Sequence, residues 1–217
     1  MLYIVATPIG NLKDITLRAL EILKSADLIA CEDTRHSKIL LDHYGIKTPT
    51  TSYFQHNRIT KGKYLIGLLK EGKNIALVSD AGTPGILDPG HHIINLAIKN
   101  QIEITAVPGP TALVNALVLS GKPSHKFVFE GFLPKGSLAR KNRLKQLASL
   151  KHTIVFYESC YRILATLEDI QEVLPDREIV CVRELTKKFE ELKRGSPKEI
   201  QESLKKQKPR GEFVVVI

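Results

Sequence analysis

The sequence predicts an α/β protein whose first half is a parallel sheet with helices on both faces. Short apolar segments rich in β-branched or aromatic residues alternate with segments whose apolar residues recur at helical spacing. Loops rich in Gly and Pro follow several of the apolar segments. A hydrophobic share of 43% and a charged share of 25% are typical of a globular protein.

The first half of the chain carries the alternation most clearly. The expected strands are LYIVAT (2–7), DLIAC (27–31), TSYF (51–54), NIALVS (74–79) and EITAV (103–107). The expected helices are LRALEILKSA (17–26), SKILLDHYG (37–45), KYLIGLLKEG (63–72) and HHIINLAIKN (91–100). Strands that alternate with helices form parallel sheets, because each crossover helix packs on a sheet face.

The order of elements changes in the second half. The expected strands there are 126–133, 152–158, 177–185 and 212–217, and the expected helices are 137–150, 161–174 and 197–207. Gly121, Pro123 and Ser124 fall beside a shift in charge, which indicates a domain boundary. We therefore expect two domains, 1–121 and 122–217.

The basic charge is concentrated in the second half. The chain carries a net charge of +9, of which residues 1–120 contribute +2 and residues 121–217 contribute +7. No acid lies between Glu130 and Glu158, a segment that holds Lys135, Arg140, Lys141, Arg143, Lys145 and Lys151. Such a cluster is typical of a surface that binds nucleic-acid phosphates and equally of a solvated helix face, so charge alone leaves both open.

Several classes of protein are disfavoured by the sequence. Cys31, Cys160 and Cys181 are too few and too widely spaced to indicate a disulfide framework or a zinc site, and we expect no metal. The longest apolar stretch is interrupted by the Pro-Gly-Pro at 108–110, which argues against a membrane span. The N-terminus does not resemble a signal peptide, so a cytoplasmic location is expected.

Four loops with unusual composition follow expected strands. They are TPIGNLKDIT, CEDTRHSK, SDAGTPGILDPG and VPGPTAL. Ligands of open α/β sheets bind where parallel strands end, so four such loops at one edge favour a binding cleft. GxGxxG and GxxxxGK[ST] motifs are missing from the sequence, which argues against a dinucleotide or nucleoside triphosphate site.

These motifs together resemble a known family. TPIGNLKDIT, CEDTRHSK, LVSDAGTPGILDPG, PGPTAL, FYES and RELTK, in this order, are similar to the ribosomal RNA small-subunit methyltransferase I family of the tetrapyrrole methylase superfamily. The resemblance implies a parallel-sheet N-terminal domain, a mixed-sheet C-terminal domain and a cofactor cleft between them. It also implies a homodimer that uses S-adenosylmethionine to methylate the ribose 2′-oxygen of a decoding-region cytidine in 16S rRNA of the small ribosomal subunit. Relatives commonly continue into a further helical segment beyond the strand that matches EFVVVI.

The resemblance also suggests which residues form the site. The predicted cofactor contacts are Pro8, Gly10, Asp80, Ala81, Gly82, Thr83, Thr111, Ala112, Tyr157 and Leu185. The predicted catalytic residues are Glu32, Asp33, Arg35, Glu158 and Lys187, and the sequence does not decide which of them accepts the hydroxyl proton. Arg183 and Glu184 fit catalysis and a strand-end ion pair equally well. The predicted RNA contacts are Arg140, Lys141, Arg143 and Lys145.

Two alternatives stay open from the sequence. A tetrapyrrole carbon methylase shares the fold, although such relatives typically carry a GxGPGD-like loop where this chain has TPIGNL. An RNA-binding ribosome-assembly factor that has lost catalysis would share the fold too, although the intact loops oppose it.

Overall fold

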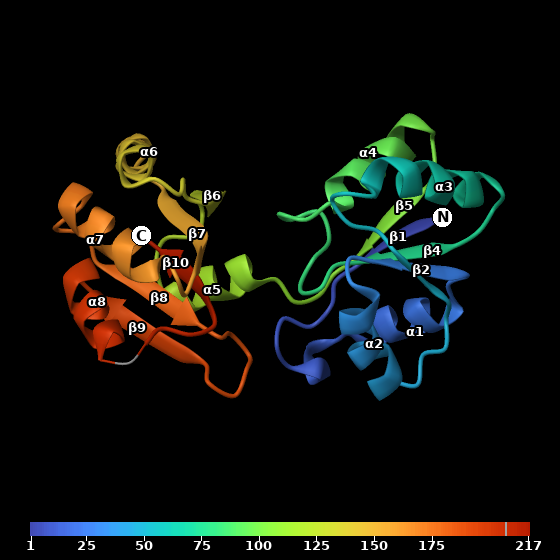
Figure 1. Ribbon diagram of the computed structural model, residues 1–217, viewed down its shortest axis with the longest axis horizontal. Coiled ribbons are helices and arrows are strands. Elements are labelled where there is room, and N and C mark those ends of the chain that lie inside the picture. Colours follow the sequence, from blue (N-terminus) through green and yellow to red (C-terminus); the bar gives the residue numbers. More distant parts are fainter. Residues whose placement is uncertain (207) are drawn as a thin grey trace. The chain divides into compact units, whose positions relative to one another are not determined.

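The computed structural model describes residues 1–206 and 208–217, which form two compact units (Figure 1). The first unit is Met1–Thr111 and the second is Ala112–Ile217. The division expected after Gly121 differs from this one by a helix, α5 (Ala112–Ser120). This helix packs against β7 (Thr153–Ser159) and β10 (Glu212–Val216), both strands of the second unit.

The first unit is a five-stranded sheet with helices on both faces. Its strands are β1 (Leu2–Val5), β2 (Leu28–Cys31), β3 (Thr50–Ser52), β4 (Ile75–Val78) and β5 (Ile104–Val107). Its helices are α1 (Leu17–Ser25), α2 (Thr34–His43), α3 (Arg58–Lys70) and α4 (Gly90–Lys99), with a short 3-10 helix, η1 (Leu12–Asp14). The strands lie in the order β3-β2-β4-β1-β5 and all neighbours are parallel, which confirms the predicted sheet.

The two faces of this sheet bury separate cores. Successive strand residues point to opposite faces, so Ile75 of β4 packs among residues of α3 and α4 while Ala76 packs among those of α1 and α2. Figure 1 shows α3 and α4 on one side of the strands and α1 and α2 on the other. Leu23 of α1 and Leu65 of α3 are fully buried at the centres of these two cores. Burial on both faces explains why these strands are continuously apolar.

The second unit contains a mixed sheet in the order β6-β7-β10-β8-β9. Its remaining strands are β6 (Phe127–Phe132), β8 (Ile179–Arg183) and β9 (Glu191–Gly195), and its remaining helices are α6 (Ser137–Ser149), α7 (Ile163–Val173) and α8 (Pro197–Lys205). β6 and β7 are parallel, whereas β10 runs antiparallel to both β7 and β8. The last residue of the helix expected over 197–207 lies outside the described residues.

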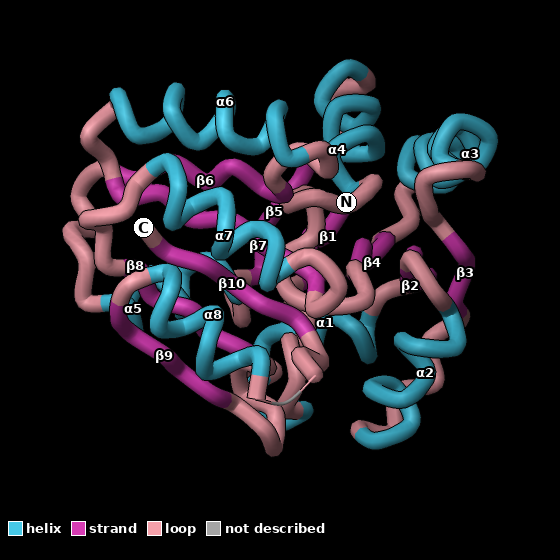
Figure 2. Tube along the Cα trace, turned by 60° about the vertical axis from the view of Figure 1, so that its left-hand side comes forward, coloured by secondary structure: helices cyan, strands magenta, loops and turns pink. Residues whose placement is uncertain are grey.

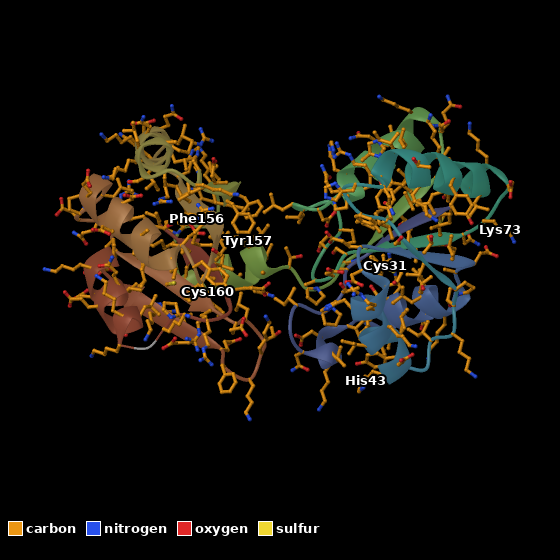
Figure 3. The ribbon with its side chains drawn as sticks, viewed as in Figure 1. Cys31, His43, Lys73, Phe156, Tyr157 and Cys160 are labelled. Carbon is orange, nitrogen blue, oxygen red and sulfur yellow. The ribbon has the colours of Figure 1, made fainter. Side chains whose placement is uncertain are left out.

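Three helices cover one face of the second sheet and α5 covers the other. Figure 2 shows α6, α7 and α8 side by side, and their buried residues share a core with alternate residues of β7, β8 and β10. Figure 3 labels Phe156, whose ring is fully buried in this core, and Tyr157, the next residue of β7. The sequence does not predict β9, because this edge strand reads ELKRG and lacks an apolar pattern.

Candidate active site

The loop that follows β1 is joined to the loop that follows β4 by two backbone hydrogen bonds. The amide of Thr7 donates to the carbonyl oxygen of Gly82 at 2.9 Å, and the amide of Gly82 donates to the carbonyl oxygen of Thr7 at 3.0 Å. The buried hydroxyl of Thr7 also donates to the carbonyl oxygen of Ser79 at 3.2 Å. These contacts hold the loop after β4 against the loop that carries Pro8 and Gly10.

The loop that follows β5 is attached to the same surface. The hydroxyls of Thr83 and Thr111 share a hydrogen bond of 2.6 Å, and the Thr83 hydroxyl lies 3.3 Å from the carbonyl oxygen of Pro110. A Cβ on Gly109 would lie 2.9 Å from the Cβ of Ala6, so only glycine allows this loop to lie so close to the end of β1. Three loops therefore form one surface at the carboxyl edge of the first sheet.

Asp80 connects a fourth loop, the one that follows β2. Its Oδ1 accepts a hydrogen bond from the amide of Asp33 at 3.0 Å, while its Oδ2 receives none from the described residues. Asp33 itself caps α2: its Oδ1 accepts from the amide of Arg35 at 2.8 Å, and the two side chains form an ion pair at 2.8 Å. These bonds hold the pKa of Asp33 far below its usual range. Both oxygens of Asp33 are thus engaged, whereas Asp80 keeps a free acceptor.

Glu32 lines a small hollow of the first unit, and its carboxylate is close enough to Asp80 for their charges to interact. The hollow is lined by Glu32, Tyr53, Leu77, Val78, Ser79, Pro84, Asp88, Pro89 and Gly90. Burial raises the pKa of Glu32, and the negative charges of Asp80 and Asp88 raise it further. A carboxylate with a raised pKa is a better proton acceptor than an ordinary one.

Asp88 fixes the shape of the loop after β4, and it is not among the site residues predicted from the sequence. Its carboxylate accepts hydrogen bonds from the amide of Gly85 at 2.8 Å and from the amide of Gly90 at 2.7 Å. Burial nevertheless raises the pKa of Asp88 above its usual value. An aspartate two residues before a glycine in a turn is the signal that could have revealed this role.

Tyr157 positions the first turn of α5 in the second unit. Its hydroxyl oxygen accepts a hydrogen bond from the amide of Leu113 at 3.2 Å, next to Ala112. Its ring makes edge-to-face contacts with Phe129 and Phe132, whose centroids lie 5.0 and 6.0 Å away. Burial raises the pKa of this phenol. Tyr157 therefore holds Ala112 in place, and both residues belong to the predicted cofactor contacts.

Glu158 is enclosed by partners within the second unit. Its side chain is buried, and its oxygens accept from the hydroxyl of Thr166 at 2.7 Å and from the amide of Ser159 at 2.8 Å. Arg162 forms an ion pair with it at 3.3 Å. This environment gives Glu158 a structural role and leaves it poorly placed to accept a substrate proton.

The RELTK segment forms the loop between β8 and β9. Glu184 and Thr186 adopt left-handed backbone conformations, with φ of 52° and 63°, and Leu185 between them is buried. Lys187 forms ion pairs with Glu184 at 3.0 Å and with Glu212 at 2.9 Å. Burial disfavours the charged form of Lys187, but these two carboxylates outweigh it and raise its pKa. Lys187 is thus held as a cation and is unsuited to act as a base.

The basic helix α6 uses much of its charge inside the second unit. Arg140 is only 4% exposed and its Nε lies 2.6 Å from an oxygen of Asp169 on α7. The structure therefore contradicts the expectation that Arg140 contacts RNA, because the guanidinium is buried and neutralised. Lys141 pairs with Glu172, and Arg143 makes a bidentate pair with Glu130 at 2.6 and 2.7 Å. Lys145 is exposed. The RNA roles of Lys141, Arg143 and Lys145 stay predictions.

The described residues hold no group of three or more His, Cys, Asp or Glu side chains placed to bind a metal ion. None of the helices in the described ranges is both long and apolar enough to span a membrane. The three cysteines are free thiols, and Figure 3 labels Cys31 in the first unit and Cys160 in the second.

Comparison with known proteins identifies the class. Residues 1–201 match the family described as Tetrapyrrole (Corrin/Porphyrin) Methylases. The fold is similar to a crystal structure of diphthine synthase, with a TM-score of 0.76 and 15% identity over 100% of this chain and 88% of that one. It is also similar to cobalt precorrin-4 methyltransferase, with a TM-score of 0.71 and 18% identity over 99% of this chain and 93% of that one. The chain therefore has the tetrapyrrole methylase fold.

Relatives that match the whole length of this chain identify its family within this superfamily. A protein from Haemophilus influenzae named ribosomal RNA small subunit methyltransferase I is 50% identical over the whole chain and 78% of its own length. A protein of the same name from Thermotoga maritima is 49% identical over the whole chain and 97% of its own length. The chain belongs to the ribosomal RNA small subunit methyltransferase I family.

Proposed function

We propose that this chain transfers a methyl group from S-adenosylmethionine to the ribose 2′-oxygen of a decoding-region cytidine in 16S rRNA. The observation that carries the proposal is the surface of four loops at the carboxyl edge of the first sheet, which hydrogen bonds join through Thr7, Asp80 and Thr83. Full-length relatives with about 50% identity, named as methyltransferases of small-subunit ribosomal RNA, support the same activity.

The residues of this surface fit the proposed cofactor. Ala81 is exposed. Gly82 has φ of +82°, and a Cβ added to it would touch the side chain of Ile9. The small, exposed side chain of Ala81 leaves room for a ligand at this loop, whereas the amide and carbonyl of Gly82 are bonded to Thr7 and fix the loop's shape. The free Oδ2 of Asp80 can accept a hydrogen bond from a ribose hydroxyl or an amino group. The cofactor contacts predicted for Ala112, Tyr157 and Leu185 stay predictions.

The reaction requires a residue that accepts a proton. The bound cofactor supplies an electrophilic methyl group on a sulfonium sulfur. The 2′-hydroxyl that would receive this methyl group must lose its proton, and a residue of this chain has to accept it. Asp33 is occupied as a helix cap and Lys187 is held as a cation, whereas burial raises the pKa of Glu32. We assign the proton to a carboxylate oxygen of Glu32, and positioning of the two substrates supplies much of the remaining acceleration.

Replacement of Asp80 by alanine tests the cofactor site. Asp80→Ala removes a loop acceptor rather than core packing, so affinity for S-adenosylmethionine measured by calorimetry should fall at least about tenfold in a folded protein. Asp27→Ala is the matched control, because Asp27 accepts a hydrogen bond from the amide of Asn74 at 2.8 Å at the opposite edge of the sheet. Equal affinities of the two variants would show that the cofactor binds elsewhere.

A transfer assay separates the proposal from its alternatives. Purified protein is incubated with labelled S-adenosylmethionine and either unmodified small ribosomal subunits or a reduced tetrapyrrole, and ribose methylation is mapped on the 16S rRNA. Label on a cytidine 2′-oxygen supports the proposal, and label on the tetrapyrrole alone refutes it. If the wild-type protein does not bind S-adenosylmethionine, the alternative of a non-catalytic RNA-binding ribosome-assembly factor is favoured. We also propose a cytoplasmic homodimer, and sedimentation at several protein concentrations tests the oligomeric state.

A further inference from the structure

Four segments of the second unit meet at one edge of its sheet. β6, β7 and β8 run in the same direction, and β10 runs against them. The register pairs Phe132 with Tyr157, Glu212 with Ser159, and Phe213 with Arg183. The loop after β6, the turn after β7, the segment before β10 and the loop after β8 therefore lie in a row. At a strand spacing of about 4.8 Å, the row from β6 to β8 extends roughly 14 Å.

This edge presents exposed aromatic rings. Tyr161 in the turn after β7 is 91% exposed, Phe189 in the loop after β8 is 65% exposed, and Phe132 at the end of β6 is 53% exposed. Single exposed rings are common on protein surfaces, but these three lie on neighbouring segments of one sheet edge. Their spread over three separate loops favours a partner that crosses the edge.

The loop that carries Phe189 is fixed before any partner binds. The amide of Thr186 donates to the carboxylate of Glu190 at 2.6 Å, and the amide of Glu184 donates to the carbonyl oxygen of Glu212 at 3.0 Å. Glu184 and Thr186 hold left-handed conformations that cost free energy in residues other than glycine. Preorganisation of this kind lowers the entropy lost when a ligand is bound.

The charge at this edge is unbalanced toward cations. At this edge, Lys135, Lys188, Lys208 and Arg210 are exposed and form no ion pair with a described acidic side chain. Three of the acids nearby are paired, since Glu158 pairs with Arg162 and both Glu184 and Glu212 pair with Lys187. Glu190 is exposed and, among the described residues, accepts only from the amide of Thr186, so the four unpaired cations outnumber the unpaired acid. Lys188 also lies 5.6 Å from the ring centre of Phe189. The edge thus combines free cations with exposed rings.

We propose that this edge, defined by Phe132, Tyr161, Lys188, Phe189 and Arg210, binds single-stranded rRNA by stacking unpaired bases on Tyr161 and Phe189 while the cations contact phosphates. Aromatic rings on a basic surface are the elements by which proteins bind unpaired RNA. The inference rests on the proposed function, and it places the RNA on this edge rather than on α6, whose arginines are neutralised by Asp169 and Glu130.

Alanine variants of the two rings test the proposal. Tyr161→Ala and Phe189→Ala should each weaken binding of unmodified 16S rRNA roughly tenfold, because each removes one stacking platform, and should leave the salt dependence unchanged. Tyr64→Ala is the matched control, because Tyr64 on α3 is 50% exposed and lies 5.1 Å from a lysine ammonium, that of Lys61. Circular dichroism and affinity for S-adenosylmethionine establish that each variant is folded.

Charge variants give an independent measurement. Lys188→Ala and Arg210→Ala should each reduce the slope of log affinity against log salt concentration by about 0.7. Lys145→Ala on α6 should leave it unchanged. If the ring variants bind like Tyr64→Ala, or if Lys145→Ala has the larger effect on the slope, the edge does not bind the RNA. Failure of the wild-type protein to bind rRNA would instead refute the proposed function, so the two outcomes are distinguishable.

Discussion

The buried ion pair between α6 and α7 provides the sharpest test of how the second unit is stabilised. Asp169 and Arg140 are each 4% exposed. Asp169 accepts from the Nε of Arg140 at 2.6 Å and from the hydroxyl of Ser137 at 2.7 Å. Arg140 also donates to the carbonyl oxygens of Pro134 and Lys135, at 3.3 and 3.0 Å. One pair therefore fixes both the helix contact and the loop after β6.

Asp169→Ala would leave the guanidinium of Arg140 buried without its counter-charge. Loss of one partner of a buried pair costs about 3–5 kcal/mol. Each kcal/mol lost from the free energy of unfolding lowers the Tm of a domain of about 100 residues by roughly 4 °C or more. We therefore expect the melting temperature of the second unit to fall on the order of 15 °C. Differential scanning calorimetry measures this shift, with urea unfolding as a second determination.

Two controls separate the buried charge from other effects. Glu172→Ala breaks the pair between Glu172, whose side chain is 63% exposed, and Lys141 without removing a partner of Arg140, so it should lower the Tm far less than Asp169→Ala. Arg140→Met combined with Asp169→Leu removes both charges, and it should recover much of the stability that Asp169→Ala loses. A Tm for Asp169→Ala within a few degrees of wild type would refute the reasoning, as would a double variant less stable than the single one.

Two further predictions concern the loops of the first unit. Gly82→Val places a β-branched side chain at φ of +82°, so the bridge to Thr7 should be disturbed and both cofactor binding and methyl transfer should be lost; an active Gly82→Val protein would show that the loop only supports the fold. The pKa of Glu32 is higher in the folded protein than in the unfolded chain. Protonated Glu32 therefore stabilises the folded state, and this stabilisation is lost as the pH rises from the unfolded-state pKa through the raised folded-state pKa. Glu32→Gln should therefore abolish methyl transfer and yet increase stability in urea at neutral pH, with the difference vanishing in acid; retained activity, or equal stability at every pH, would argue against the assigned role.

Much of the fold follows from local sequence patterns. The continuously apolar segments NIALV and LYIV predict strands buried on both faces, and the structure places them at the centre of a parallel sheet. The start of α8 at Pro197 was predicted correctly, and there Ser196 and Glu199 form a capping box through contacts only three residues apart. The helices expected from residues 37 and 63 instead begin at Thr34 and Arg58, before their apolar pattern starts. The β9 strand was not readable, because its polar residues pair with β8 through backbone hydrogen bonds that any side chain permits.

The sequence by itself also determined which loops build the candidate site. The Gly and Pro residues around Gly82 and Gly109 mark places where two backbone segments approach closely. The sequence shows these places because only glycine, which has no Cβ, allows such an approach. The charge state and partners of the side chains were decided only by the tertiary structure. In the sequence, Arg140 belongs to a basic segment and was predicted to contact RNA. Folding instead brings it against Asp169, which lies 29 residues away in the chain. Glu32 likewise acquires its raised pKa first from burial and then from the charges of Asp80 and Asp88, and both effects depend on distance in space rather than on position in the chain.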